Sequence, residues 1–349
     1  MSIKSNMDFT SKLTNWYQEN RRELPWRQTR NPYKIWLSEI ILQQTRIEQG
    51  LSYYVKFTEI YPTIFDLAEA TEEEVLKSWQ GLGYYSRARN LHHTARYVAE
   101  NLKGKFPDNY KELLQLKGIG DYTASAIASI CFNEPQAVVD GNVYRVLSRI
   151  FGIQTPVNAS GAAKEFKALA QQYLDKRDAG GFNQAMMEFG ALYCKPQNPD
   201  CLNCIFQADC YAFNHQKVKE LPVKTAGVKV RPRYFNYLVI ISEDNKTLLE
   251  KRTASGIWKN LYQFPLIEKE KNTRVKLDEV QELLNGIQVK SLSLYNKKPV
   301  LHKLSHQHLH IQFWVVHTTP LDESGIQISQ IEELPVPIVL HKFIVDFPF

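Results

Sequence analysis

Two carboxyl groups in this sequence lie in surroundings that should give them different protonation states. Glu39 lies in a helical pattern that begins after Pro32 and has apolar neighbours, so burial would raise its pKa and keep it protonated as a general acid. Asp140 comes just before a second helical pattern, where backbone amides would hold it ionised. Such a pair suits cleavage of a glycosidic bond. The alternatives are a solvent-facing, ion-paired Glu39 and an Asp140 that only caps its helix.

Four cysteines lie within seventeen residues in the spacing Cys-x6-Cys-x2-Cys-x5-Cys. They are Cys194, Cys201, Cys204 and Cys210. Four thiolates suit either a tetrahedral zinc ion or a [4Fe–4S] cluster, and ligand chemistry alone leaves both open. The fifth cysteine, Cys131, lies in an apolar helical stretch and is interpreted as a core thiol. An odd count with this clustering argues against a secreted disulfide framework.

A third feature is a Gly-x-Gly turn, Gly118 to Gly120, between two helical patterns in residues 113–124. The glycines permit a tight turn, and the free amides at the start of the second helix would bind a phosphate group. The pattern therefore indicates a helix-hairpin-helix that grips DNA without regard to sequence. Taken alone, the same residues would also suit an ordinary loop between helices.

The elements that must position these residues change type along the chain. The first part has helical patterns, and residues 214–230 contain lysines, Pro222 and few large apolar residues, which is typical of a linker. Residues 234–241, 247–252 and 308–316 are rich in β-branched and aromatic side chains and predict strands, and residues 277–284 predict a helix. We expect domains at 1–213 and 231–349, joined by the linker 214–230.

Composition and charge restrict the class of protein. A chain of 349 residues is long enough for two or three packed units, and its formal charge of +6 is compatible with a polyanionic partner. The apolar runs are far shorter than the roughly 20 residues of a membrane helix. The first six residues do not resemble a secretory signal. We therefore expect a cytoplasmic, nucleoid-associated protein that contacts no membrane and works as a monomer.

The motifs together resemble one family. The cysteine spacing, the hairpin and the stretches Ser-Glu-Ile-Ile-Leu-Gln-Gln-Thr (38–45) and Val-Asp-Gly-Asn-Val (139–143) resemble the MutY family of adenine DNA glycosylases, in the endonuclease III superfamily, across residues 8–215. The resemblance implies an α+β multi-domain fold: an all-α helix-hairpin-helix glycosylase core with a six-helix barrel module and a [4Fe–4S] loop at 194–210. A Nudix-like α/β recognition domain should follow. Zinc ribbons usually have two Cys-x2-Cys knuckles, and this chain has one.

The resemblance also implies a mechanism. Glu39 would protonate N7 of adenine and then handle the attacking water, Asp140 would offset the charge of the oxocarbenium ion, and Asn142 would orient these groups. Tyr122 stands where relatives with lyase activity have a nucleophilic lysine, and a phenol cannot form a Schiff base. We therefore expect a monofunctional glycosylase that hydrolyses the N-glycosidic bond of adenine paired with 8-oxoguanine or guanine in double-stranded DNA.

Further residues are assigned to the base or the duplex by the same resemblance. They are Arg22, Trp26, Arg27, Gln44, Thr45, Leu82, Tyr84, Gly118, Gly120, Gln184, Ser305 and His306. The alternative for Trp26 is an ordinary core position, and for Leu82 and Tyr84 a glycine-rich turn. The stretch 304–306 resembles the Phe-Ser-His loop that reads 8-oxoguanine, with Leu304 in place of phenylalanine. The second domain has no cluster of glutamates for magnesium, so we expect it to recognise DNA and not to hydrolyse a nucleotide.

Two other functions remain compatible with the sequence. One is an endonuclease III-like glycosylase with lyase activity on damaged pyrimidines, against which Tyr122 and the second domain both argue. The other is a DNA-binding protein that has kept the fold without the activity. The retention of both Glu39 and Asp140 argues against that function.

Overall fold

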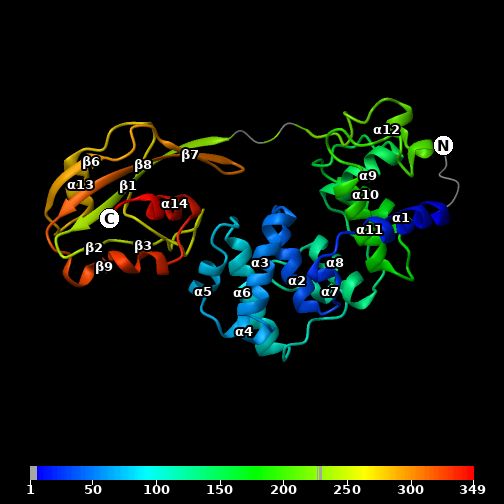
Figure 1. Cartoon of the computed structure of the whole chain (residues 1–349), viewed down its shortest axis with the longest axis horizontal. Helices are drawn as coiled ribbons and strands as arrows, with labels where there is room; N and C mark the ends of the chain where they lie inside the picture. The colour runs from blue at the N-terminus through cyan, green and yellow to red at the C-terminus, as the bar shows by residue number, and fades with distance from the viewer. Residues whose placement is uncertain (1–5, 226, 228–229) are drawn as a thin grey trace. The chain divides into compact units, whose positions relative to one another are not determined.

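The computed structural model describes residues 6–225, 227 and 230–349 and contains two compact units (Figure 1). The first unit consists of residues 1–69 and 90–226, and the second of residues 70–89 and 227–349. The domain limits expected from the sequence stay predictions, and residues 226, 228 and 229 of the expected linker lie outside the described residues. In the described part of the chain, no helix has the length and apolar character needed to cross a membrane.

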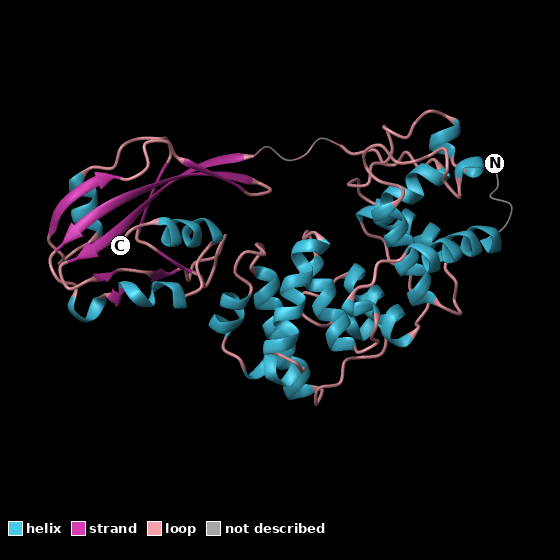
Figure 2. Cartoon of the chain, viewed as in Figure 1, coloured by secondary structure: helices cyan, strands magenta, loops and turns pink. Residues whose placement is uncertain are grey.

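The first unit is built from helices joined by loops (Figure 2). Its helices are α1 (Asn6–Asn20), α2 (Pro32–Leu42), α3 (Ile47–Ile60), α4 (Ile64–Glu69), most of α6 (Ser86–Asn101), α7 (Tyr110–Leu113), α8 (Asp121–Phe132), α9 (Gly141–Phe151), α10 (Ala162–Tyr173), α11 (Ala179–Leu192) and α12 (Tyr211–Asn214), with the short 3-10 helices η1 (Pro25–Arg27) and η2 (Gln207–Asp209).

Four of these helices form the frame of the candidate site. Helix α8 is buried on all sides from residue 123 to residue 130, because its sequence is almost entirely small or apolar, and it contacts both α2 and α11. Helix α9 is amphipathic: Val143, Val146, Leu147 and Ile150 lie on its buried face, and α9 contacts α11. Helix α9 ends at Phe151, and its C-cap Gly152 has a φ of +73°, which glycine adopts without strain. Glu39, Tyr122, Asp140 and their neighbours are therefore fixed to the core.

The predicted hairpin is present between α7 and α8. Helix α7 is a single turn, and the N–H of Ile119 donates to the carbonyl of Leu116 at 3.1 Å within the connection. Gly118 has a φ of +80°, and a Cβ atom there would lie 2.7 Å from Cβ of Asn90, so both its conformation and its close contact require glycine. Gly120 is the N-cap of α8.

The second unit is built around a mixed sheet with the order β5-β1-β8-β6, in which β7 also pairs with β8. Strands β1 and β8 run parallel, and the other pairs are antiparallel. The elements are α5 (Glu72–Ser78), β1 (Arg231–Ser242), β2 (Lys246–Thr247), β3 (Glu250–Lys251), β4 (Tyr262–Gln263), β5 (Leu266–Lys269), α13 (Leu277–Leu283), β6 (Val289–Leu294), β7 (Val300–Lys303), β8 (Gln307–Thr318), η3 (Asp322–Ser324), β9 (Ile326–Gln327), η4 (Ile328–Glu333) and α14 (Ile338–Asp346).

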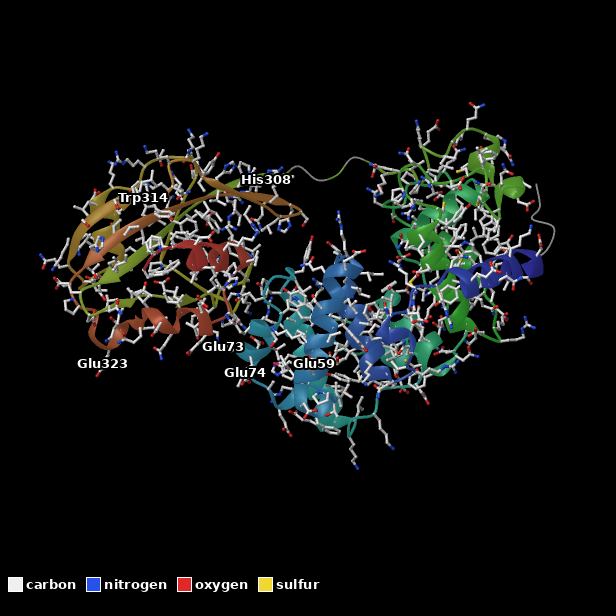
Figure 3. The ribbon with its side chains drawn as sticks, viewed as in Figure 1. Glu59, Glu73, Glu74, His308, Trp314 and Glu323 are labelled. Carbon is white, nitrogen blue, oxygen red and sulfur yellow. The ribbon has the colours of Figure 1, made fainter. Side chains whose placement is uncertain are left out.

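Helices cover both faces of this sheet. Trp314 on β8, labelled in Figure 3, belongs to the core cluster with Val280 of α13, and its indole N–H donates to the Asn236 side chain at 3.1 Å. The next residue back, Phe313, points to the other face and stacks on Phe343 of α14 with 3.8 Å between ring centroids. The strands expected at 234–241 and 308–316 lie within β1 and β8, and the helix expected at 277–284 is α13.

One predicted strand is interrupted. Residues 247–252 do not form a continuous strand, because β2 ends at Thr247 and β3 begins at Glu250, and the two pair with different partners. Residues 70–89 join this unit through direct contacts: Tyr262 donates to Glu73 at 3.0 Å, and the N–H of Val336 donates to the Gln80 side chain at 3.1 Å.

Candidate active site

Glu39 lies on the inner side of α2. Asn31 caps this helix by accepting the N–H of Lys34 at 3.2 Å, and Pro32 occupies its first turn, which explains where the helix begins. The Glu39 side chain is buried. Burial raises its pKa to about 7, against the opposing effect of a hydrogen bond with Tyr122, and the nearby charge of Asp140 raises it further. The solvent-facing alternative for Glu39 is therefore wrong.

Asp140 is the N-cap of α9, as the sequence predicts. Its Oδ1 accepts the N–H groups of Asn142 at 2.9 Å and Val143 at 2.8 Å, and its Oδ2 accepts the side-chain amide of Asn142 at 2.8 Å. The expectation that these amides depress the pKa of Asp140 is wrong in direction. Burial raises the pKa, and the three hydrogen bonds and the charge of Arg145 only oppose that effect.

Tyr122, the second residue of α8, interacts with both acids. It forms a hydrogen bond with Glu39, and its hydroxyl also lies 3.6 Å from the sulfur of Met187. Burial and the charges of Glu39 and Asp140 raise the pKa of Tyr122 well above its ordinary value, so the phenol stays protonated and donates. Glu39, Tyr122 and Asp140 come from α2, α8 and the start of α9. They therefore act on one another electrostatically, and burial raises the pKa of all three.

Asn142 links Asp140 to a buried arginine. Arg145 donates from Nη2 to Asn142 Oδ1 at 2.9 Å and to the carbonyl of Gly190 at 2.6 Å, and from Nε to the carbonyl of Cys194 at 2.8 Å. Gly190 lets α11 lie this close, because a Cβ there would be 2.6 Å from Cβ of Asn142. The orientation of Asp140 thus depends on the packing of α9 against α11.

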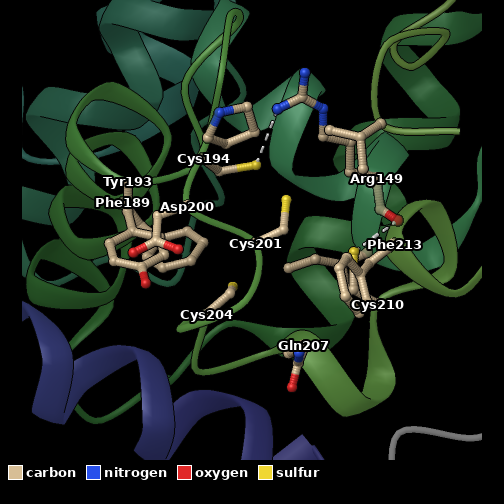
Figure 4. Close-up of a pocket in the computed structure, with 13 residues that line it drawn as sticks. Arg149, Phe189, Tyr193, Cys194, Asp200, Cys201, Cys204, Gln207, Cys210 and Phe213 are labelled. Atoms are coloured by element: carbon tan, nitrogen blue, oxygen red, sulfur yellow. Dashed lines mark hydrogen bonds between the residues drawn. The ribbon is translucent and has the colours of Figure 1, made fainter. Parts of the chain in front are cut away.

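The four cysteines of the 194–210 loop line one cavity (Figure 4). Arg149 of α9 holds the start of this loop: its Nη1 donates to Cys194 Sγ at 3.5 Å and to the carbonyl of Lys195 at 2.7 Å. Two further contacts involve the sulfurs, since Phe206 N–H donates to Cys204 Sγ and Cys210 Sγ donates to the Arg149 carbonyl, both at 3.4 Å. Cys131, which the sequence predicts to be a core thiol, lies elsewhere, on α8, and is half-buried.

The lining of this cavity bears on which group the four cysteines fit. Among the described residues, no group of three or more His, Cys, Asp or Glu side chains gathers closely enough to hold a metal ion. The cysteines instead surround a cavity that is also lined by Ile150, Phe189 and Phe213. Four cysteine side chains that line one cavity are a donor set that fits a [4Fe–4S] cluster.

The hairpin presents the N-terminal end of α8. No side chain caps this end, and at Gly120 a Cβ atom would meet nothing within 4 Å, so the backbone is open there. Asp121 adds a negative charge beside it, but its carboxylate binds the ammonium group of Lys167 and accepts the Tyr110 hydroxyl at 2.5 Å. The positive end of the helix is therefore not opposed by a free acid.

Arg22 and Arg27 bind the same carboxylate, that of Glu188 on α11. Arg27 also acts electrostatically on Glu39, whose pKa it lowers slightly against the larger effect of burial. Trp26 lies between the two arginines in the chain, is buried, and packs edge-on against Tyr54 with 5.1 Å between centroids. This contact favours the core position for much of its ring.

Gln184 lies one turn before Glu188 on α11. Its Oε1 accepts a hydrogen bond from the hydroxyl of Tyr17 at 2.8 Å, and its amide nitrogen takes no part in this bond. Gln184, Tyr17 and Arg27 line a polar cavity of about 210 Å³ together with residues at the start of α11. Gln184 and Arg27, which the sequence assigns to the adenine pocket, thus line one cavity, and the assignment itself stays a prediction.

The residues expected to enter the duplex lie in two turns. Gln44 follows α2 with a φ of 55° and is exposed, and Thr45 donates its N–H to the carbonyl of Leu42 at 3.2 Å. In the second unit, Tyr84 is 48% exposed with a φ of 47°, whereas Leu82 is only 7% exposed. Tyr84 and Gln44 are therefore available at the surface, and Leu82 is not.

Ser305 and His306 form the tip of the β7–β8 turn in the second unit, which the N–H of Leu304 closes by donating to the carbonyl of Gln307 at 2.9 Å. Both side chains are exposed, and Ser305 Oγ lies 3.2 Å from His306 Nδ1. Their hydrogen-bonding groups are therefore presented to solvent.

Sequence reasoning missed three residues of this site. Arg145 could have been suspected from its position three residues after Asn142, which puts the two side chains on one face of α9. Glu188 lies on the face of α11 that carries Gln184, four residues earlier. Gly190 left no signal in the sequence alone, because its contact with Asn142 depends on how two distant helices pack.

Comparison with known proteins gives the same fold and chemistry. Residues 37–176 match the HhH-GPD superfamily of base excision DNA repair proteins, and residues 236–345 match the NUDIX domain. The chain is 35% identical to the adenine DNA glycosylase of Buchnera aphidicola subsp. Baizongia pistaciae (strain Bp) over 310 residues, which cover 88% of this chain and 86% of the relative. It is 42% identical to the adenine DNA glycosylase of Homo sapiens over 228 residues, 63% of this chain and 41% of that relative.

A solved structure of a thermostable thymine-DNA glycosylase matches 60% of this chain and 97% of its own length, with a TM-score of 0.56 and 31% identity. These matches confirm the predicted helix-hairpin-helix core and Nudix-like domain. The extent of the similarity to the Buchnera enzyme decides the family. The chain belongs to the adenine DNA glycosylases of the helix-hairpin-helix superfamily, hydrolases of base excision repair that cleave the N-glycosidic bond of adenine in DNA.

Proposed function

We propose that the protein removes adenine paired with 8-oxoguanine or guanine from double-stranded DNA and leaves the sugar–phosphate strand intact. The observation that carries this proposal is the meeting of Glu39 with Tyr122 and Asp140 from two other helices. An acid with a pKa of about 7 still carries its proton in half of the molecules at neutral pH. That is the protonation state needed to make adenine a leaving group.

The chemistry follows from these side chains. The adenine is flipped out of the helix, at a cost of a few kcal/mol, and Glu39 gives its proton to N7 as the glycosidic bond breaks. Asp140, whose ionised form the amides of α9 stabilise, offsets the positive charge that develops on the sugar. Glu39, now ionised, accepts a proton from the attacking water. Asn142 keeps the Asp140 carboxylate in place.

The strand stays intact because the site has no amine nucleophile at the hairpin position. Tyr122 occupies that position, and its phenol is a hydrogen-bond donor to Glu39. A phenol cannot form the Schiff base that starts strand cleavage. The endonuclease III-like activity on damaged pyrimidines is therefore the less suitable alternative.

The remaining assignments are part of the same proposal. Residues 1–213 would carry the chemistry and 231–349 would read the base opposite adenine, through the exposed groups of Ser305 and His306. Tyr84, Gln44 and Thr45 would contact the opened duplex, and the hairpin amides at Gly118 and Gly120 would bind phosphate. We expect this activity at the nucleoid, in the cytoplasm.

The cysteine cavity completes the proposal. Cys194, Cys201, Cys204 and Cys210 would hold a [4Fe–4S] cluster. When bound, the cluster supplies cross-links between the two ends of the 194–210 loop and takes no part in the hydrolysis. The loop begins directly after α11, so it is fixed beside Arg145 and Arg149.

A strand-labelled duplex with one adenine opposite 8-oxoguanine tests the function. The protein should generate a site that breaks only after treatment with hot alkali, and the free base should be adenine. Duplexes with adenine opposite guanine or thymine, with thymine opposite guanine, and with an oxidised pyrimidine serve as comparisons. Breakage without alkali would indicate a lyase, release from another duplex would indicate another substrate, and binding without any release would indicate a non-catalytic protein.

A further inference from the structure

Glu188 is the centre of a buried charge cluster that the chemistry above does not use. Its Oε1 accepts the backbone N–H and Nε of Arg22, both at 2.9 Å, and Nη1 of Arg27 at 2.8 Å. Its Oε2 accepts Nη2 of Arg22 at 2.6 Å and Nη2 of Arg27 at 2.8 Å. One carboxylate thus binds two guanidinium groups in bidentate fashion, and the segment 22–27 is closed further by Arg27 Nη1 donating to the Arg22 carbonyl at 2.9 Å.

The three side chains of the cluster differ in how far they are exposed to solvent. The Glu188 side chain is 1% exposed, that of Arg27 is 13% exposed and that of Arg22 is 30% exposed. The negative charge is therefore at the back and the two positive charges at the front, with a net charge of +1. Burial by itself would raise the pKa of Glu188, but the hydrogen bonds from Arg27 and Arg22 hold it at about 2, so the acid stays ionised at physiological pH.

Arg27, at the front of the cluster, lies near one residue of the proposed reaction. Arg27 is close enough to Glu39 to affect its ionisation, and its guanidinium lies 5.7 Å from the ring centre of Tyr17. Tyr17 in turn holds the amide of Gln184, one helical turn from Glu188. Arg22 Nη1 takes no part in the bonds to Glu188, so its N–H groups remain to serve another acceptor.

We propose that Glu188 is a positioning residue: it fixes Arg22 and Arg27 in the wall of the adenine pocket, where their N–H groups select a base edge made of ring-nitrogen acceptors. Adenine presents an acceptor at N1, whereas guanine carries a hydrogen on N1 that would face the guanidinium donors. The inference rests on the proposed function, since it needs a flipped adenine next to Glu39. Glu188 itself does not touch the base.

Two substitutions of Glu188 separate charge from shape. Glu188→Gln keeps the size but brings an NH2 group against two guanidinium donors, so both arginines lose their fixed geometry. We expect the single-turnover rate of adenine release to fall about a hundredfold, the usual effect of misplacing a positioning group by about 1 Å. Glu188→Asp keeps the charge on a shorter arm and should recover part of the rate. Glu165→Gln, an exposed acid on α10, is the control and should retain the wild-type rate.

The pH dependence of the rate separates positioning from simple structural support. The groups that face Glu39 are Tyr122 from α8, Asp140 at the start of α9 and Arg27 from η1. Without the negative charge of Glu188, the positive charge of Arg27 is less opposed, so it lowers the pKa of Glu39 further. The alkaline fall of the Glu188→Gln rate should therefore begin at lower pH than in the wild type. A support role alone would leave that pH unchanged and would weaken duplex binding and thermal stability together.

If Glu188→Gln does not fold, Arg27→Lys tests the positioning role of Glu188. The lysine keeps a positive charge against Glu188 but cannot form two parallel hydrogen bonds, and it should lower the rate at least tenfold while affinity for a duplex with an abasic site stays within threefold. The inference would be overturned by a wild-type rate and an unchanged pH profile in Glu188→Gln. If only Arg27→Lys folds, the same result in that variant would overturn it. If the wild-type protein itself releases no adenine from any duplex, the proposed function fails instead.

Discussion

The guanidinium of Arg145 donates a hydrogen bond to the side-chain oxygen of Asn142 over 2.9 Å. The same side chain donates to the carbonyl of Cys194 at 2.8 Å, and Asn142 donates to Asp140 at 2.8 Å. The carboxylate that would offset the sugar cation is therefore tied through two side chains to the backbone of the first cysteine. A change in the cysteine loop would therefore act on the position of Asp140 through these hydrogen bonds.

Replacing Arg145 by Met should break this connection at both ends. The free energy of unfolding should fall by about 3 kcal/mol, because a buried charged donor is lost and the carbonyls of Gly190 and Cys194 are left without it. The single-turnover rate should fall at least tenfold, since Asn142 no longer has a fixed partner. Thermal melting and adenine release measure the two effects. Arg96→Met, at an exposed ion pair on α6, is the control, and equal behaviour of the two variants would contradict the prediction.

The rate of adenine release should fall as pH rises through about 7. The reason is that Glu39 must be protonated to act as an acid, and burial raises its pKa to about 7. A second fall is expected on the acid side, where Asp140 becomes protonated and its charge is lost. Single-turnover rates with saturating protein between pH 5 and pH 9 measure this profile. A rate that stays constant from pH 6 to pH 9 would remove Glu39 from its role as the acid.

Glu39→Gln should abolish release and stabilise the fold at alkaline pH. A carboxyl group whose pKa is higher in the folded state than in the unfolded state binds more protons when folded, so stability falls as pH rises from about 4.5 to about 7. At pH 8 that loss amounts to about 3 kcal/mol. Glutamine does not titrate, so the variant should melt at a higher temperature than the wild type at pH 8 and at nearly the same temperature at pH 4.5. A lower melting point at pH 8 would show that Glu39 is not held in an apolar environment.

The sequence was sufficient wherever a local pattern determines the structure. The helix that begins at Pro32, the cap at Asp140 and the turn at Gly118 follow from neighbouring residues, and the structure contains all three. The break after Thr247 was not predicted, because β2 and β3 take different partners.

Predictions failed where an environment depends on distant segments. The direction of the Asp140 pKa shift was wrong, since burial by other helices outweighs the local amides. Glu188 and Gly190 acquire their contacts only when α11 packs against η1 and α9, far away in the chain.

The two glycines of the hairpin should respond differently to alanine, although they lie two residues apart. At Gly118 a Cβ would lie 2.7 Å from Asn90 and the φ of +80° is unfavourable for alanine, so Gly118→Ala should destabilise the fold by about 1–3 kcal/mol. At Gly120 the φ is −93° and a Cβ meets nothing, so Gly120→Ala should melt within a few degrees of the wild type.

DNA binding should rank the same two variants in the opposite order: Gly120→Ala, which changes stability little, should lose more affinity. The space that a Cβ at Gly120 would enter is where a phosphate would approach the free amides of α8, so Gly120→Ala should weaken binding to any duplex about tenfold, corresponding to about 1.4 kcal/mol. Because the contact is to phosphate, the loss should be the same for duplexes with and without a mispair, and the dependence of affinity on salt should become less steep. If Gly120→Ala binds as well as the wild type, the hairpin does not hold the backbone of DNA. In that case the ion pair between Lys167 and Asp121 at this end of α8 would serve only to stabilise the helix.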